Sequence, residues 1–415
     1  MRLSRRQLLA CGAWLPGVLR GQGNSRDQVT ASATRNRTPV VGIVLSSSAE
    51  GYDALRRWQP GLASTQPNDA DLSTEFVEAW VRKAIEMGAE PYRDLLTVIA
   101  PDDWVVIKTD ISCCYGLGPT VNDGGAHQPF IPGTVTDLRV VRAVVDYLME
   151  NRRGARITFA EGSQQWLPIG RSSSAVDGWT TDWGGAFGGL SYKKMVQDFS
   201  KKYPQVDFEI ADLNFTGSLE LPVLTRPMGH LNPSGTYTIA KVIHQCDKIV
   251  SIAPLKTDAR TGVALTFNNF LGIAPAAKYG FPKSGLLNLG TLDEVMVDLQ
   301  SYHPADFSIL GGSFGVEGDG PAGPGATPVH YNVLVAGMRP AAVDAVAATL
   351  MGFEPQDLPY LALAEKLDYG AARIKDIWVR CTPMERAIRP FRKPSRWAPP
   401  GLPVAVSQPP DRFSR

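Results

Sequence analysis

The strongest constraint on this chain is a repeated alternation between short apolar runs and longer amphipathic stretches. Trp104–Ile107 and Lys248–Ala253 are short and largely apolar, as expected of strands buried on both faces, whereas Thr136–Asn151 repeats apolar residues at helical spacing. The alternation predicts an α/β fold: a mostly parallel sheet with helices on both faces, in two lobes with a crevice between them. The same patterns predict further strands over 39–46, 157–160, 206–210, 307–310 and 333–336. They predict further helices over 73–87, 192–202, 263–271, 292–300, 340–351 and 358–366.

The first 33 residues are typical of a targeting segment and are set apart from the fold. Ser4–Leu9 reads Ser-Arg-Arg-Gln-Leu-Leu, the pattern of a twin-arginine export signal, and a modestly apolar stretch follows it. Ala31–Ala33 is an A-x-A-like cleavage site. We therefore expect a twin-arginine signal peptide over residues 1–33, the twin-arginine translocase as a partner during export, and a periplasmic protein. The alternative is a basic N-terminus that carries no address.

Composition bounds the rest of the chain. The 42 Lys and Arg residues balance 41 Asp and Glu, which argues against a nucleic-acid partner. No apolar run reaches the roughly 18 residues that a membrane span needs, so we expect no transmembrane segment in the mature protein. An α/β body is expected over residues 34–380, and a Pro- and Arg-rich flexible tail over 381–415.

Charged residues follow several of the predicted strands. In an open α/β sheet, ligands bind beyond the carboxyl ends of the strands, so such residues are candidates for one shared polar crevice. The candidates from this pattern are Lys108, Asp110, Glu161, Lys256, Asp258, Glu317 and Asp319.

Asp344 is a candidate for a different reason. It lies in a predicted helix, Pro340–Met351, that is apolar nearly all round and therefore expected to be buried. A buried carboxylate needs a partner or a metal ion, and a structural ion pair is as compatible with the pattern as a place in the site.

Several short motifs, in the right order over about residues 100–370, resemble the domain of unknown function 362 family. The early strand ends in Val106–Lys108, and the stretch Ile252–Thr257 is similar to the family's P-K-x-K-T-H segment. The other matching stretches are Thr261–Val263, Asn269–Gly272, Glu317–Gly323, Val343–Ala347 and Met351–Phe353.

The chain departs from the family pattern at three positions. Asp258 stands where the family usually has His, Asn268 where it has Lys, and Asp110 where it has Asn. Many relatives also carry a ferredoxin-type cysteine cluster, but the five cysteines here contain no C-x-x-C pair, so the chain has no iron–sulfur motif. An Asp in place of His favours harder, oxygen-preferring metal ions.

The leading hypothesis is an exported protein whose polar crevice binds a small anionic ligand, a divalent metal ion, or both. As an enzyme it would use Lys256, Asp258 and Lys108 in catalysis, with the lysines holding a carboxylate or phosphate. Gly318, Gly320 and Asn269 are assigned to an unidentified cofactor. The candidate metal ligands are Glu317, Asp319, Asp344, Asp110 and Glu161. The alternatives are a non-catalytic binding or maturation protein, and a redox accessory without its own cluster.

Overall fold

The computed structural model describes residues 38–46, 73–111, 133–163, 179, 183, 187–215, 217–222, 235–280, 283–320, 325–367 and 369–399. The predicted signal peptide, residues 1–33, and the last sixteen residues of the chain, 400–415, lie outside this part. None of the helices in it is long and apolar enough to cross a membrane.

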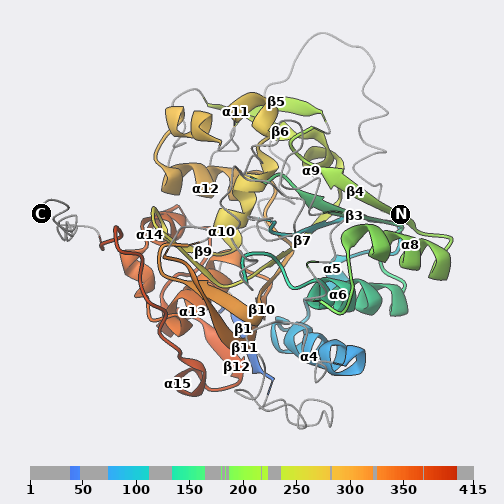
Figure 1. Cartoon of the computed structure of the whole chain (residues 1–415), viewed down its shortest axis with the longest axis horizontal. Helices are drawn as coiled ribbons and strands as arrows, with labels where there is room; N and C mark the ends of the chain where they lie inside the picture. The colour runs from blue at the N-terminus through green and yellow to red at the C-terminus, as the bar shows by residue number, and fades with distance from the viewer. Residues whose placement is uncertain are drawn as a thin grey trace, which may run out of the picture.

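One mixed, mostly parallel sheet organises the described chain (Figure 1). Its main path runs β12-β1-β11-β10-β7-β2-β3-β4, and a short β8–β9 hairpin joins it beside β10. The parallel pairs are β4–β3, β3–β2, β2–β7, β7–β10, β10–β8 and β1–β12. The strands are β1 (Val40–Leu45), β2 (Trp104–Lys108), β3 (Arg156–Glu161), β4 (Asp207–Asp212), β7 (Lys248–Ala253), β8 (Lys256–Asp258), β9 (Gly262–Ala264), β10 (Phe307–Glu317), β11 (Thr327–Gly337) and β12 (Trp378–Cys381).

Helices cover both faces of the sheet, with α4, α6 and α8 on the right in Figure 1 and α12, α13 and α14 on the left. The helices of the first face are α4 (Thr74–Met87), α5 (Leu95–Val98), α6 (Leu138–Glu150) and α8 (Tyr192–Lys202). Those of the second face are α9 (Lys241–Gln245), α10 (Thr266–Asn269), α12 (Leu292–Tyr302), α13 (Pro340–Leu350) and α14 (Pro359–Lys366). The predicted α/β class is therefore confirmed.

Side chains alternate along each strand, so each face of the sheet contributes to its own apolar core. In β2, Val105 and Ile107 belong to the apolar core under α4 and α6, while Val106 belongs to the core under α12 and α13. Because both faces are covered, β2 is buried along its whole length. This explains why the parallel strands read as continuous apolar runs in the sequence.

A smaller antiparallel sheet, β5 (Ser218–Pro222) and β6 (Thr236–Ala240), lies beside α11 (Ala276–Tyr279) at the top of Figure 1. The side chain of Tyr279 links the two, since its hydroxyl accepts a hydrogen bond from the backbone N–H of Thr238. Neither strand was predicted.

The helix predicted over 263–271 is wrong in its first part. Gly262–Ala264 forms β9, which pairs with β8, and α10 begins only at Thr266. Gly262 has a φ of 79°, a left-handed conformation that suits the turn of a hairpin and that other residues adopt only with strain. Pairing with β8 therefore takes precedence over the helical pattern of apolar residues.

The flexible tail predicted from residue 381 does not begin there, because residues 381–399 pack against the body. Phe391 is buried, and its backbone N–H donates to the carbonyl of Met351. Tyr331 donates a hydrogen bond from its hydroxyl to the carbonyl of Ala387 in α15 (Met384–Ala387). The prolines of this segment rule out long helices but not an extended path along the surface of the fold. Flexibility stays a prediction for residues 400–415.

Candidate functional site

The candidate site lies where β2, β3 and β7 end, which we call the carboxyl end of the sheet. Lys108 is the last residue of β2 and is fully buried. Its ammonium donates to Glu161 at 2.8 Å, to the side-chain carbonyl of Asn269 at 2.6 Å and to the backbone carbonyl of Thr109 at 2.6 Å. These three bonds use the whole donor capacity of a lysine, so Lys108 is held in one position.

Asn269 brings α10 and β7 into the same network. While its carbonyl accepts from Lys108, its amide nitrogen donates to the backbone carbonyl of Lys108 at 3.2 Å and to the hydroxyl of Ser251 at 3.0 Å. The end of a helix from the second face is thereby tied to two neighbouring strands. Asn269 was predicted as a cofactor contact, and in the structure it is a hydrogen-bond partner of Lys108.

Glu161, the last residue of β3, accepts hydrogen bonds on both carboxylate oxygens. One oxygen accepts from the backbone N–H of Gly162 at 2.6 Å, and the other accepts from Lys108 and, at 3.3 Å, from the N–H of Ile111. Burial raises the pKa of Glu161, and the negative charge of Asp110 adds to this, while Lys108 opposes it. A carboxyl with a raised pKa can hold and release a proton closer to neutral pH than an ordinary Glu.

A second buried pair lies next to the first. The Lys256 ammonium is 2.6 Å from a carboxylate oxygen of Asp110 and also donates to the carbonyl of Thr134 at 3.4 Å. Asp110 is anchored in turn by its backbone N–H, which donates to the hydroxyl of Thr136 at 2.8 Å. Lys108 and Lys256, both predicted as catalytic, therefore belong to one buried region.

A third lysine, Lys283, completes this group and was missed in the sequence. It is buried, and its ammonium donates to the backbone carbonyls of Gly162 at 2.6 Å, Leu271 at 3.0 Å and Gly272 at 3.4 Å. Burial lowers the pKa of Lys283 to about 7. The negative charge of Glu161 works against this decrease, and the positive charge of Lys108 adds to it. Lys283 follows no strand, so the rule that points to strand ends could not find it.

Two glycines allow the network to close. A side-chain carbon on Gly272 would lie 2.5 Å from a Glu161 carboxylate oxygen and 2.8 Å from the Lys108 ammonium. One on Gly162 would lie 2.3 Å from the carbonyl oxygen of Gly272. Because such contacts are too short for any side chain, both positions need glycine for the lysines to reach their partners.

The other predicted site residues lie elsewhere and have structural partners. Asp258 accepts from the backbone N–H groups of Arg260 and Thr261 at 2.8 and 3.1 Å, which shapes the turn between β8 and β9. Its assignment to catalysis beside Lys256 is therefore not supported.

Glu317 and Asp319 hold residues 381–399 against the end of β10. Glu317 accepts from the backbone N–H of Arg392 at 2.9 Å, and Asp319 accepts from the backbone N–H of Ser395 at 2.6 Å. Between them, the backbone N–H of Gly318 donates to the carbonyl of Arg392 at 2.8 Å. These carboxylates act as anchors for the chain.

Gly318 and Gly320 also pack against the protein itself. A side-chain carbon on Gly318 would lie 2.3 Å from the carbonyl oxygen of Gly325, and one on Gly320 would lie 2.6 Å from that of Thr257. The close approach of two backbones therefore explains both glycines, and their assignment to a cofactor is not supported.

Asp344 acts as a positioning residue for α10. Its carboxylate accepts from the backbone N–H groups of Thr266 and Phe267 at 2.9 and 3.1 Å, and from the hydroxyl of Tyr360 at 3.2 Å. It thus satisfies the amides of the first turn of the short helix that carries Asn269. Burial raises the pKa of Asp344 to about 7, although each of these hydrogen bonds opposes the increase.

The predicted metal ligands do not converge. Glu317 and Asp319 bind the C-terminal segment, Asp344 binds α10, and Asp110 and Glu161 each pair with a lysine. Within the described ranges, no group of three or more His, Cys, Asp or Glu side chains is placed to hold a metal ion. The divalent ion on these five carboxylates therefore stays a prediction, and in this arrangement each of the five accepts at least one hydrogen bond from a protein donor.

Comparison with known proteins identifies a family but no activity. The family model described as "Domain of unknown function (DUF362)" matches residues 120–349, more than half of the chain. No curated protein sequence matches significantly.

Among solved structures, the lactate racemase apoprotein from Thermoanaerobacterium thermosaccharolyticum is similar at 13% identity and a TM-score of 0.31, over 61% of this chain and 52% of that one. The matched region spans about half of that protein, and a likeness this weak carries no argument about activity.

Proposed function

We propose that this chain, which belongs to the DUF362 family, binds a small organic anion at the carboxyl end of its sheet and transfers a proton to or from it. The observation that carries the proposal is the buried group of Lys108, Lys256 and Lys283 beside Asp110 and Glu161. Three lysines against two carboxylates leave this group one positive charge in excess when all five are ionised, which favours an anionic ligand.

Lys283 and Glu161 would carry the proton. Burial lowers the pKa of Lys283 to about 7 and raises the pKa of Glu161. Both pKa values therefore shift toward neutral pH, where a general acid or base with a matching pKa is most efficient. Lys108 acts on both groups. Its ammonium pairs with Glu161, and its positive charge destabilises the protonated form of Lys283. Lys108 and Asn269 are positioning residues in this scheme, because Lys108 holds the carboxylate of Glu161 and Asn269 holds Lys108.

The test is deuterium uptake from D2O into a panel of short-chain carboxylic acids, followed by mass spectrometry with the purified full-length protein. We expect uptake into at least one acid with the wild type and loss of uptake with Lys283→Met. The matched control is Lys278→Met, the same change five residues earlier on the exposed side of α11. Uptake that survives Lys283→Met would exclude Lys283 as the proton carrier.

A non-catalytic binding protein is the alternative function. It predicts that an acid of the panel raises the thermal midpoint of the protein while no deuterium is incorporated. If no acid either stabilises the protein or exchanges a proton, the proposed function is wrong in both forms.

We also propose that residues 1–33 direct export through the twin-arginine translocase to the periplasm. The proposal is supported by Arg5 and Arg6 in the segment Ser4–Leu9, which lies outside the described residues. Changing both arginines to lysine keeps the charge but should leave the protein in the cytoplasm of a bacterium with a working translocase. Fractionation and immunoblotting measure the outcome, and unchanged export of the variant would refute the assignment.

A further inference from the structure

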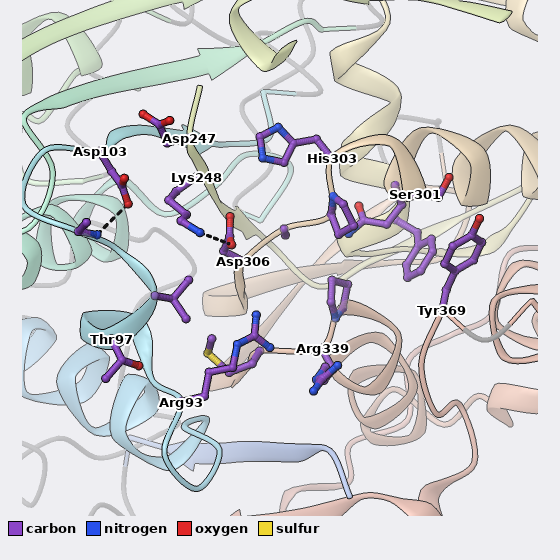
Figure 2. Close-up of a pocket in the computed structure, with 18 of the residues that line it drawn as sticks. Arg93, Thr97, Asp103, Asp247, Lys248, Ser301, His303, Asp306, Arg339 and Tyr369 are labelled. Atoms are coloured by element: carbon purple, nitrogen blue, oxygen red, sulfur yellow. Dashed lines mark hydrogen bonds and ion pairs between the residues drawn. The ribbon is translucent and has the colours of Figure 1, made fainter. Parts of the chain in front are cut away.

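A cavity of about 690 Å³ lies at the opposite end of the sheet, where β2, β7 and β10 begin. We call this the amino end of the sheet. Its walls include Asp103 and Lys248 beside the strand starts, Arg339 and Pro340 at the start of α13, and the last turns of α12 (Figure 2). The volume falls within the range of about 300 to 1,000 Å³ that is common for small-molecule sites.

One wall of this cavity has an excess of positive charge. The guanidinium groups of Arg93 and Arg339 share a single buried carboxylate, Glu90, at 3.8 Å and 2.8 Å. Burial lowers the pKa of Arg93, and the neighbouring charge of Arg339 lowers it further, while Glu90 and Asp306 act in the other direction. Two cations against one buried anion give this wall one positive charge in excess, which the charge of Asp306 offsets in part.

Four carboxylates also line the cavity, those of Asp102, Asp103, Asp247 and Asp306, and none of them forms an ion pair with Arg93 or Arg339 within 4 Å. Asp306 is occupied by the Lys248 ammonium at 3.3 Å and by the backbone N–H of Ile249 at 3.0 Å. Asp103 accepts from the backbone N–H of Ala100, and Asp247 accepts from that of Trp104. In Figure 2, Asp103 and Asp247 lie toward the opposite side of the cavity from Arg93 and Arg339.

A second observation points to a ligand in the same cavity. Gln300, on α12, lines it and is only 4% exposed, yet neither the oxygen nor the nitrogen of its side-chain amide has a hydrogen-bond partner. A buried amide without partners destabilises a folded protein, so its presence needs a reason. A ligand that meets the amide, after a rotation of the Gln300 side chain, would supply one. Phe267 and Tyr369 provide aromatic surface in the same lining.

We propose that this cavity is a second ligand site, which takes a small organic anion bearing a carboxylate or phosphate. The anionic group would lie at Arg93 and Arg339, where charge-assisted hydrogen bonds from guanidinium groups are strongest. An amide or hydroxyl group of the ligand would hydrogen-bond with Gln300. The start of α13, at Arg339 and Pro340, adds the positive end of a buried helix to the same wall.

The anion subsite is tested by calorimetric titration of the full-length protein with inorganic phosphate. Arg93→Gln should weaken binding roughly tenfold, because one charge-assisted partner is lost. The matched control is Arg82→Gln on α4, whose side chain is 37% exposed against 34% for Arg93 and whose ion pair with Glu150 lies away from the cavity. Equal phosphate affinity in the wild type and Arg93→Gln, or no binding at all, would overturn the proposal.

Gln300→Leu tests the amide separately. If the amide is kept for a ligand, removing it should raise the thermal midpoint of the unliganded protein, by about 2 °C. A lowered midpoint would show that Gln300 stabilises the fold, and an unchanged midpoint would show that its amide has no net cost; either result would remove it from the site. Lys283→Met distinguishes phosphate binding at the two ends of the sheet. If phosphate binding is lost in Lys283→Met and kept in Arg93→Gln, the anion binds at the carboxyl end instead.

Discussion

The two ends of the sheet differ in how their charged side chains are paired. At the carboxyl end, Lys108 makes three hydrogen bonds and Glu161 is bound on both oxygens, so these two charged groups are satisfied, although the buried hydroxyl of Thr109 beside them has no partner. At the amino end, two guanidinium groups share one carboxylate and the amide of Gln300 has no partner, around a cavity of about 690 Å³. The contrast teaches that a concentration of charge and an accessible binding space are separate properties.

Asp344 connects the two ends. It lies on α13, which begins at the cavity with Arg339, and its carboxylate holds the first turn of α10. The last residue of α10 is Asn269, a partner of Lys108. A change at one end of this path can therefore alter the position of a group at the other through a short chain of contacts.

The largest effect is expected when the closed network is opened. Lys108→Met leaves Glu161 and Asn269 buried without their donor, so the free energy of unfolding should fall by about 3 to 5 kcal/mol. Urea denaturation measures the change. Lys194→Met, which removes an exposed ion pair with Asp198, should cost no more than about 0.5 kcal/mol.

A double variant checks the reason for that loss. Adding Glu161→Gln to Lys108→Met removes the uncompensated charge, so part of the lost stability should return. If the double variant is as unstable as the sum of the two single variants, the pair does not act as a unit, and the contrast between the two ends loses its basis.

A smaller, pH-dependent effect is expected at Asp344. Because its pKa is about 7 in the folded protein and near 4 in an unfolded chain, the folded state binds the extra proton between these values. The free energy of unfolding should therefore fall as the pH rises from about 4 to 7, by on the order of 4 kcal/mol at most. Asp344→Asn, which does not titrate, should lack this contribution.

The measurement is the difference in unfolding free energy between the wild type and Asp344→Asn across that pH range. Asp207→Asn, at an exposed position at the start of β4, serves as the control and should keep the slope of the wild type. A parallel pH dependence of wild type and Asp344→Asn would show that folding does not raise the pKa of Asp344.

The smallest effect on stability is expected at the amino end. Arg93 is 34% exposed and lies 3.8 Å from Glu90, so Arg93→Gln should change the free energy of unfolding by less than about 1 kcal/mol. Urea denaturation of Arg93→Gln and of Lys108→Met under the same conditions compares the two losses in unfolding free energy. A loss as large as that of Lys108→Met would show that the basic wall is part of the stabilising framework and not free to serve a ligand.

Much of the fold could be predicted because the relevant signal is local. The strands β2 and β7 and the helices α4 and α8 were predicted to within a residue or two, since each has an apolar pattern of its own. The β8–β9 hairpin and the β5–β6 sheet were not, because short strands are defined by their partners. Residues 381–399 were expected to be mobile from their prolines, yet Phe391 and the anchors at Glu317 and Asp319 order them.

The sequence by itself determined the α/β class, the alternation that buries both faces of the sheet, and the placing of Lys108 and Glu161 at strand ends. Only the tertiary structure decided which charged groups meet. It separated Asp258 and Asp344 from the lysines, added Lys283, and left Gln300 without a partner beside a cavity. The physical reason is that apolar periodicity is written along the chain, whereas a hydrogen bond or a salt bridge depends on distances between residues that are far apart in it.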